Sequence, residues 1–133
     1  MNRTLFLILF TLSLNASHIH WQSNFDQAHQ KALKEHKNLL VLLIEKNSLI
    51  STEVLRTTFM NQPYIKRLNA EFIAILVTKG QKKSYPIEML YTFTYPSLFF
   101  LNSDELFLHE PIRGNINPKT VKSTLKEINS THK

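Results

Sequence analysis

Apolar residues early in the chain first follow a helical period and then form an unbroken run. Residues 24–36 place apolar side chains at i, i+3, i+7 and i+8, the spacing of one helix face: Phe25, Ala28, Ala32 and Leu33. Ser23, with Asp26 three residues later, resembles an acidic capping box at the start of this helix. Residues 39–44 are all leucine, valine or isoleucine, which is typical of a strand covered on both faces of a sheet.

A second helical period and a second apolar run follow. Apolar positions from Ser51 to Leu68 follow a helical period, which the proline-containing residues 61–63 interrupt. Residues 72–77 then form another apolar strand. Two buried strands joined by a helical crossover form a βαβ unit, so we expect the two strands to pair in parallel.

The next part of the chain predicts a short helix and an antiparallel hairpin. After a polar loop, Pro86 suits the first turn of a short helix whose apolar residues are Ile87, Leu90 and Tyr91. Residues 97–101 form a third apolar strand directly after Pro96. Residues 102–104 have turn-forming side chains, so residues 106–108 are expected to return as the second strand of the hairpin.

The last segment predicts a helix. Gly114 ends the hairpin segment, Asn117 is placed to cap the helix, and Pro118 suits its first position. The inward positions of this helix are Val121, Leu125 and Ile128. Together the elements predict one α/β domain, with a central mixed sheet of about four strands flanked by helices.

The first 17 residues predict a cleavable signal peptide. A positive charge at Arg3 precedes an apolar run over residues 5–14, which is shorter than the ~20 residues that span a bilayer. Small residues at Ala16 and Ser17 suit cleavage by signal peptidase. We therefore expect residues 18–133 to form one periplasmic or secreted domain with no stable membrane span.

The composition limits the chemistry of this domain. The chain contains no cysteine, so it can form no disulfide and perform no thiol chemistry. The formal net charge is +6, but the basic residues are scattered, with the densest run at residues 79–83. Scattered charge is typical of a solvated surface, so we expect no nucleic-acid partner. We also expect no cofactor.

The order of these elements resembles the thioredoxin superfamily, in particular exported thioredoxin-like proteins with a long helix after the active-site motif. The resemblance covers residues 21–128. Its most specific parts are Pro96 before the third strand, Gly114 after the hairpin, and the pattern Phe59-x3-Pro63-x-Ile65-x2-Leu68-Asn69-x2-Phe72. The resemblance implies a three-layer fold with helices on both faces of the sheet.

In that family, two cysteines occupy a four-residue motif at the N-terminus of the helix after the first central strand. The positions that match this motif are Ser48, Leu49, Ile50 and Ser51. Two hydroxyls cannot form a redox couple, and the family's buried acidic residue before the motif is matched by Leu42. The resemblance therefore implies a member that has lost its redox function.

Pro96 indicates peptide binding through the same resemblance. In the family the bond before this proline is cis, and the backbone groups of the preceding residue, here Tyr95, pair with an extended peptide or with glutathione. Tyr95, Leu49 and Ile50 would then form an apolar rim suited to an extended segment of a partner. The leading interpretation is an exported, redox-inactive module that binds an extended peptide or assists the maturation of another exported protein.

Other interpretations of these residues remain open. Ser48 and Ser51 have an ordinary explanation as helix-capping residues. Ser48 also resembles the position that binds the thiol ligand in glutathione transferases, which gives a thiol-ligand enzyme as the alternative, although the chain has no room for their second, all-helical domain. Pro96 has an alternative role in merely shaping the hairpin, and the domain would then have no site.

His18 and His20 are candidates for a metal site. If the signal peptide is cut after Ser17, the mature chain begins His18-Ile19-His20. Its amino group, two backbone amides and third-position imidazole could then surround copper(II) in a square plane. Cleavage one residue earlier would remove this chelate, so the hypothesis depends on the cleavage site.

Overall fold

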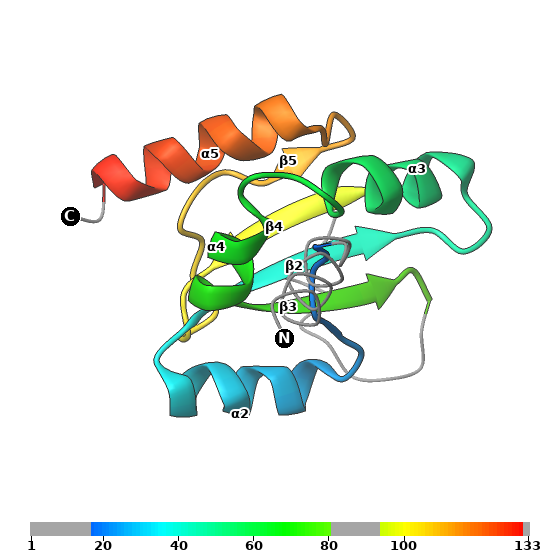
Figure 1. Cartoon of the computed structure of the whole chain (residues 1–133). Coiled ribbons are helices and arrows are strands. Elements are labelled where there is room, and N and C mark those ends of the chain that lie inside the picture. The colour runs from blue at the N-terminus through cyan, green and yellow to red at the C-terminus, as the bar shows by residue number, and fades with distance from the viewer. Residues whose placement is uncertain (1–16, 81–93, 132–133) are drawn as a thin grey trace, which may run out of the picture.

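The structure is a computed structural model that describes residues 17–80 and 94–131 (Figure 1). Its elements in chain order are β1 (Trp21–Gln22), α2 (Phe25–Glu35), β2 (Asn38–Ile44), α3 (Leu49–Thr58), α4 (Ile65–Glu71), β3 (Phe72–Thr78), β4 (Ser97–Leu101), β5 (Ile112–Arg113) and α5 (Pro118–Thr131). The predicted signal peptide, apart from Ser17, and the predicted helix after Pro86 lie outside these residues. Within them, no helix is long and apolar enough to cross a membrane.

The strands form one mixed sheet in the order β1-β3-β2-β4-β5. β2 pairs with β3 in parallel over its full length, which confirms the predicted βαβ unit. β2 also pairs with β4 in antiparallel fashion, from Leu39 opposite Leu101 to Leu43 opposite Ser97. Within the described residues the sheet has five strands instead of about four, because two-residue strands add at both edges, β1 beside β3 and β5 beside β4.

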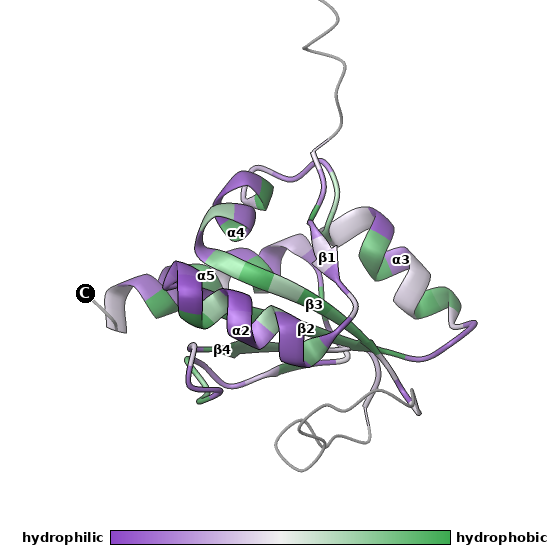
Figure 2. Cartoon of the chain, turned by 90° about the horizontal axis from the view of Figure 1, so that it is seen from below, coloured by the Kyte–Doolittle hydropathy of each residue, from purple (hydrophilic) through white to green (hydrophobic). Residues whose placement is uncertain are grey.

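Helices cover both faces of the sheet, so the fold has three layers, with α2 on the face opposite α3 and α5 in Figure 1. Successive residues of a strand point to opposite faces. Leu39, Val41 and Leu43 therefore join the core beneath α2. Leu40 and Leu42 join the core beneath the other helices. Figure 2 shows the result, with hydrophobic central strands behind the largely hydrophilic outer face of α2.

The predicted turn and antiparallel return after β4 are confirmed, but residues 106–108 are not a full strand. Phe107 forms an isolated antiparallel bridge with Leu101, flanked by hydrogen bonds of 2.8 Å from the N–H of Asn102 to the Leu106 carbonyl and from the N–H of Leu108 to the Phe100 carbonyl. A tight turn reverses the chain, and in it the Asn102 side chain accepts hydrogen bonds from the backbone N–H groups of Asp104 and Leu106. The chain then runs on to β5, which pairs with Ser97 and Leu98 at the edge of the sheet.

The helix starts differ from two of the predictions. Asn24, not Ser23, caps α2, because the Asn24 side chain accepts from the N–H of Gln27. α3 starts at Leu49, two residues before the predicted start at Ser51. The predicted start of α5 is confirmed, since Asn117 Oδ1 accepts from the N–H of Thr120 at 3.0 Å and Pro118 is the first helical residue.

Candidate functional site

The two motif serines have different roles at the start of α3. Ser48 caps the helix, as its Oγ accepts from the N–H of Ser51 at 3.2 Å. Ser51 lies inside the first turn with 2% of its surface exposed, and its Oγ accepts from the N–H of Glu45 at 3.4 Å. The capping role is therefore right for Ser48 and wrong for Ser51, which instead joins the helix to the loop after β2.

These serines have no activating partner in the described part of the chain. Each of the two hydroxyls accepts from a backbone amide, and neither hydroxyl is paired there with a carboxylate or an imidazole. Leu42, which matches the family's buried acid, is fully buried in the core beneath α3. A nucleophilic serine needs an adjacent base, so this arrangement supports a structural role for both hydroxyls.

Leu49 and Ile50 are exposed on the first turn of α3. Their exposed fractions are 87% and 63%, the two largest among the exposed large apolar side chains of the described chain. They border a groove of about 440 Å³ between α3 and the turn that joins β5 to α5. The residues that line the groove are Leu49, Ile50, Glu53, Val54, Thr57, Gly114, Asn115, Ile116 and Asn117.

The Tyr95–Pro96 peptide bond is cis, which confirms the prediction for this bond. Pro96 is buried beside the groove, and its carbonyl oxygen accepts from the N–H of Gly114 at 2.8 Å. Tyr95 does not join Leu49 and Ile50 in a rim, because its ring packs against the core on the α2 side of the sheet. The structure thus brings Leu49, Ile50 and the Pro96 segment to one end of the sheet, with Gly114 as the link.

Comparisons with known proteins give the fold. No protein-family profile and no curated protein matches the sequence. A protein of Bacteroides thetaiotaomicron assigned as a disulphide isomerase superposes with a TM-score of 0.73 over 90% of this chain and 99% of its own, at 16% identity. The fold is thioredoxin-like. The DsbH oxidoreductase matches with a TM-score of 0.66 at 13% identity, covering 84% of this chain and 85% of its own.

The C-terminal domain of Neisseria meningitidis DsbD in its oxidised form is also similar, with a TM-score of 0.59, 21% identity and coverage of 80% of this chain and 97% of that domain. Identities this low show the fold alone. These three proteins are described by redox names, whereas this thioredoxin-like chain contains no cysteine. Thiol–disulfide exchange requires an attacking thiolate, so the chain cannot be a dithiol oxidoreductase.

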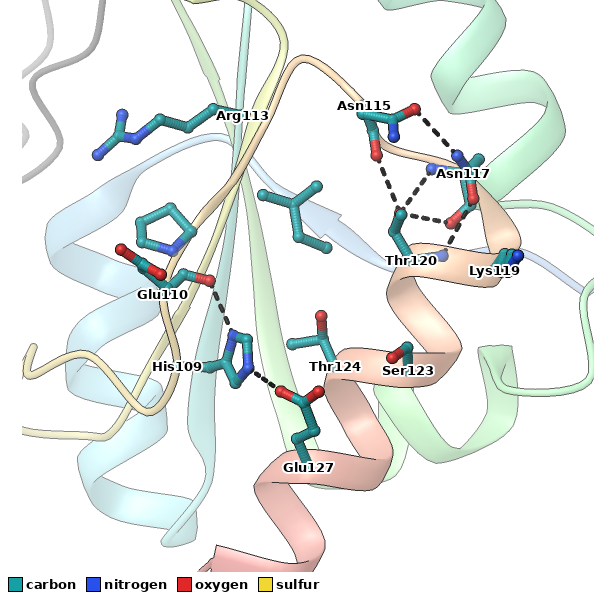
Figure 3. A pocket seen from close by; sticks show the side chains of 12 residues that line it. His109, Glu110, Arg113, Asn115, Asn117, Lys119, Thr120, Ser123, Thr124 and Glu127 are labelled. Carbon is teal, nitrogen blue, oxygen red and sulfur yellow. Dashed lines mark hydrogen bonds and ion pairs between the residues drawn. The ribbon is translucent and has the colours of Figure 1, made fainter.

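A second cavity, of about 560 Å³, lies between residues 109–113 and α5 (Figure 3). In it, His109 Nε2 pairs with a carboxylate oxygen of Glu127, and His109 Nδ1 donates to the carbonyl oxygen of Glu110 at 2.9 Å. Both ring nitrogens face acceptors, so the protonated imidazolium satisfies both contacts. His109 is therefore a tether between the β5 segment and α5, and it has no free nitrogen to act as a base.

This tether predicts a pH-dependent contribution to stability. The hydrogen bond to the Glu110 carbonyl raises the pKa of His109 above its ordinary value of 6.5; burial opposes this rise, and Glu127 adds to it. A raised folded-state pKa stabilises the fold fully below about pH 6.5, and the contribution is lost as the pH rises through the folded-state value. We expect His109→Gln to lower the free energy of unfolding at pH 5.5 by no more than about 1 kcal/mol, because the pair is partly exposed.

Thermal unfolding at pH 5.5 and pH 8.5 measures this effect. The difference between the parent chain and His109→Gln should shrink at the higher pH, with Glu127→Gln as the matched variant on the other side of the pair. Besides Glu110 and Glu127, the charged groups of this cavity are Arg113 and Lys119. An equal difference at the two pH values would contradict the role of the imidazolium.

His18 and His20 lie near the C-terminal end of α3, at the end away from the groove, on a segment that hydrogen bonds hold to the rest of the domain. The N–H of Ile19 donates to the Phe59 carbonyl at 3.4 Å, and the N–H of His20 donates to Asn69 Oδ1 at 3.0 Å. The predicted copper(II) chelate needs both of these amide nitrogens as ligands, so it would have to break both hydrogen bonds. No group of three His, Cys, Asp or Glu side chains in residues 17–80 and 94–131 is placed to hold a metal ion.

Proposed function

We propose that this chain is an exported, redox-inactive thioredoxin-like module that binds an extended, apolar peptide segment, and that it thereby assists the maturation of another exported protein. The observation that carries the proposal is the exposure of Leu49 and Ile50 beside the groove along α3. Export rests on the N-terminal sequence pattern, and the loss of redox function rests on the absence of cysteine.

The shape of the groove favours an extended segment. Its helical wall runs from Leu49 to Thr57, which is about 12 Å at 1.5 Å per residue. An extended chain rises about 3.3 Å per residue, so about four residues fit along this wall.

The chemistry of the groove favours apolar side chains on that segment. Leu49, Ile50, Val54 and Ile116 provide an apolar surface. On the opposite wall Asn117 Nδ2 donates to Asn115 Oδ1 at 3.1 Å, and Asn115 Nδ2 is the amide group there that can donate to a peptide carbonyl. Among the described residues, the one charged residue in the lining is Glu53, which Arg56 holds through two hydrogen bonds of 2.7 and 2.8 Å. The described lining therefore offers no unpaired charge that would select a charged peptide.

A fluorescence anisotropy titration tests the proposal with a labelled eight-residue peptide that alternates valine and threonine. We expect saturable binding to the parent chain and at least tenfold weaker binding to the Leu49→Lys/Ile50→Lys variant. A tenfold change in Kd corresponds to about 1.4 kcal/mol of binding free energy, which is less than the free energy gained by burying one leucine side chain.

Leu33→Lys is the matched control, because Leu33 is also an exposed apolar residue but lies on α2, on the other face of the sheet. It should bind the peptide as the parent does. Equal binding by all three proteins, or no binding by the parent, would contradict the proposal. Titration with glutathione tests the alternative function. If the parent chain binds glutathione and the Ser48→Ala variant does not, the result favours the thiol-ligand enzyme instead.

A further inference from the structure

His18 and Met60 face each other across a short antiparallel bridge. The bridge pairs these two residues directly. It is flanked by two hydrogen bonds, from the N–H of Ile19 to the Phe59 carbonyl and from the N–H of Asn61 to the Ser17 carbonyl at 2.8 Å. This is the non-hydrogen-bonded type of pair, in which Cα atoms lie about 4.5 Å apart and the two side chains extend to the same face.

His20 joins this pair from the same strand. Residues two apart in an extended segment point to the same face, and the rings of His18 and His20 meet edge to face with centroids 5.5 Å apart. An imidazole nitrogen binds a metal at about 2.0 Å, so its ring centroid lies about 3 Å from the ion. Two such rings at a near-tetrahedral angle have centroids about 5 Å apart, close to the observed separation.

One side chain fixes the backbone of both histidines. Asn69 Oδ1 accepts from the N–H of His20 at 3.0 Å, and Asn69 Nδ2 donates to the carbonyl of His18 at 2.8 Å. The backbone of the segment is therefore held on the body of the domain, while the imidazoles of His18 and His20 stay exposed. Held ligands lose less conformational entropy when they bind an ion.

The surroundings suit a soft, low-charge ion. His18 and Met60 both line a cavity of about 390 Å³, whose other residues include Trp21, Leu55 and Leu76. The one permanently charged residue in its described lining, Arg56, is bound to Glu53. A site with a thioether, two imidazoles and no carboxylate favours copper(I) over hard divalent ions.

The geometry points to a copper(I) site formed by the side chains of His18, His20 and Met60. The sequence suggested a copper(II) chelate that uses the Ile19 and His20 amide nitrogens. The copper(I) site uses side chains only, so these two amides keep their hydrogen bonds. The site does not depend on the peptide groove, and it does not need cleavage after Ser17. Silver(I), which has similar ligand preferences and no redox chemistry, should occupy the same side chains.

The test is a competition for copper(I) against the coloured chelator bicinchoninate, under anaerobic reducing conditions. The chain is expressed at full length and used in the N-terminal form in which it is recovered, with that terminus sequenced. We expect one equivalent of copper(I) per chain, and at least tenfold weaker binding after Met60→Leu, His18→Ala or His20→Ala. Met60→Leu keeps the apolar volume, so it removes only the thioether.

His36→Asn is the matched control, because it removes an exposed histidine at the end of α2, where the residue has a φ of 56° that asparagine tolerates. It should bind copper(I) as the parent does. Copper(I) affinity that is unchanged by Met60→Leu, or is lowered equally by His36→Asn, would overturn the proposal. Circular dichroism of each variant checks that the fold is intact.

NMR with silver(I) provides a second readout. We expect the ring protons of His18 and His20 and the methyl group of Met60 to shift, while the amide signals of Ile19 and His20 persist. Loss of the Ile19 and His20 amide signals on addition of silver(I), or the absence of any shift at Met60, would overturn the side-chain site.

Discussion

The Ser48→Cys/Ser51→Cys variant is expected to form an intramolecular disulfide under mild oxidant, whereas the parent chain shows no disulfide reductase or isomerase activity. Ser48 caps α3, and its Oγ lies 3.2 Å from the N–H of Ser51, so the two side chains start from adjacent points on the first turn. A disulfide needs Cβ atoms about 3.5–4.5 Å apart, which a cap and the third helical residue can reach. Closing this four-residue loop should stabilise the oxidised form by up to about 2 kcal/mol.

Mass spectrometry after thiol alkylation measures the disulfide, and thermal unfolding with and without reductant measures its effect on stability. Leu49→Cys/Thr52→Cys is the matched control, with the same spacing moved one residue into the helix, where side chains three apart have Cβ atoms about 5–6 Å from each other. That pair should stay largely reduced. If the two variants oxidise equally, or if Ser48→Cys/Ser51→Cys stays reduced, our assignment of the motif positions is wrong.

The parts of the fold that repeat over many residues could be predicted from the sequence. The apolar runs of β2 and β3 and the apolar face of α5 are long enough for the pattern to identify them. β1 and β5 have two residues each, which is too short for any period. Their place at the sheet edges is set by tertiary contacts, such as the T-shaped pair of Trp21 with Phe59.

The residues of the candidate sites also fall into those that the sequence could identify and those that only the fold brings together. The sequence identified Leu49, Ile50 and Pro96 because a resemblance supplied their positions. It missed Asn115 and Asn117 as the second wall of the groove, since only the return of the chain after β5 brings them there. It also missed Met60, which is 42 residues from His18 in the sequence and becomes its neighbour only through the bridge.

Gly114 connects the groove to the Pro96 segment, and replacing it should be among the most destabilising single changes in the chain. Its φ is 81°, a conformation that costs other residues roughly 1–2 kcal/mol. A Cβ at this position would lie 2.9 Å from Thr94 Cγ2, so the Thr94 side chain must also shift. We expect Gly114→Ala to lower the free energy of unfolding by roughly 2–3 kcal/mol in denaturant titrations, the sum of strain and contact.

Gly80→Ala separates the two causes of this loss. Gly80 has a similar φ of 78°, but a Cβ there meets nothing within 4 Å, so only the strain of roughly 1–2 kcal/mol applies. Thr94→Ser removes the methyl group that Gly114→Ala would meet, and the double variant should therefore recover the contact part of the loss while Thr94→Ser alone changes little. A double-mutant cycle over these variants measures that coupling directly. If Gly114→Ala and Gly80→Ala are equally destabilising, and Thr94→Ser gives no recovery, the close approach of residue 94 to Gly114 does not constrain this end of the groove.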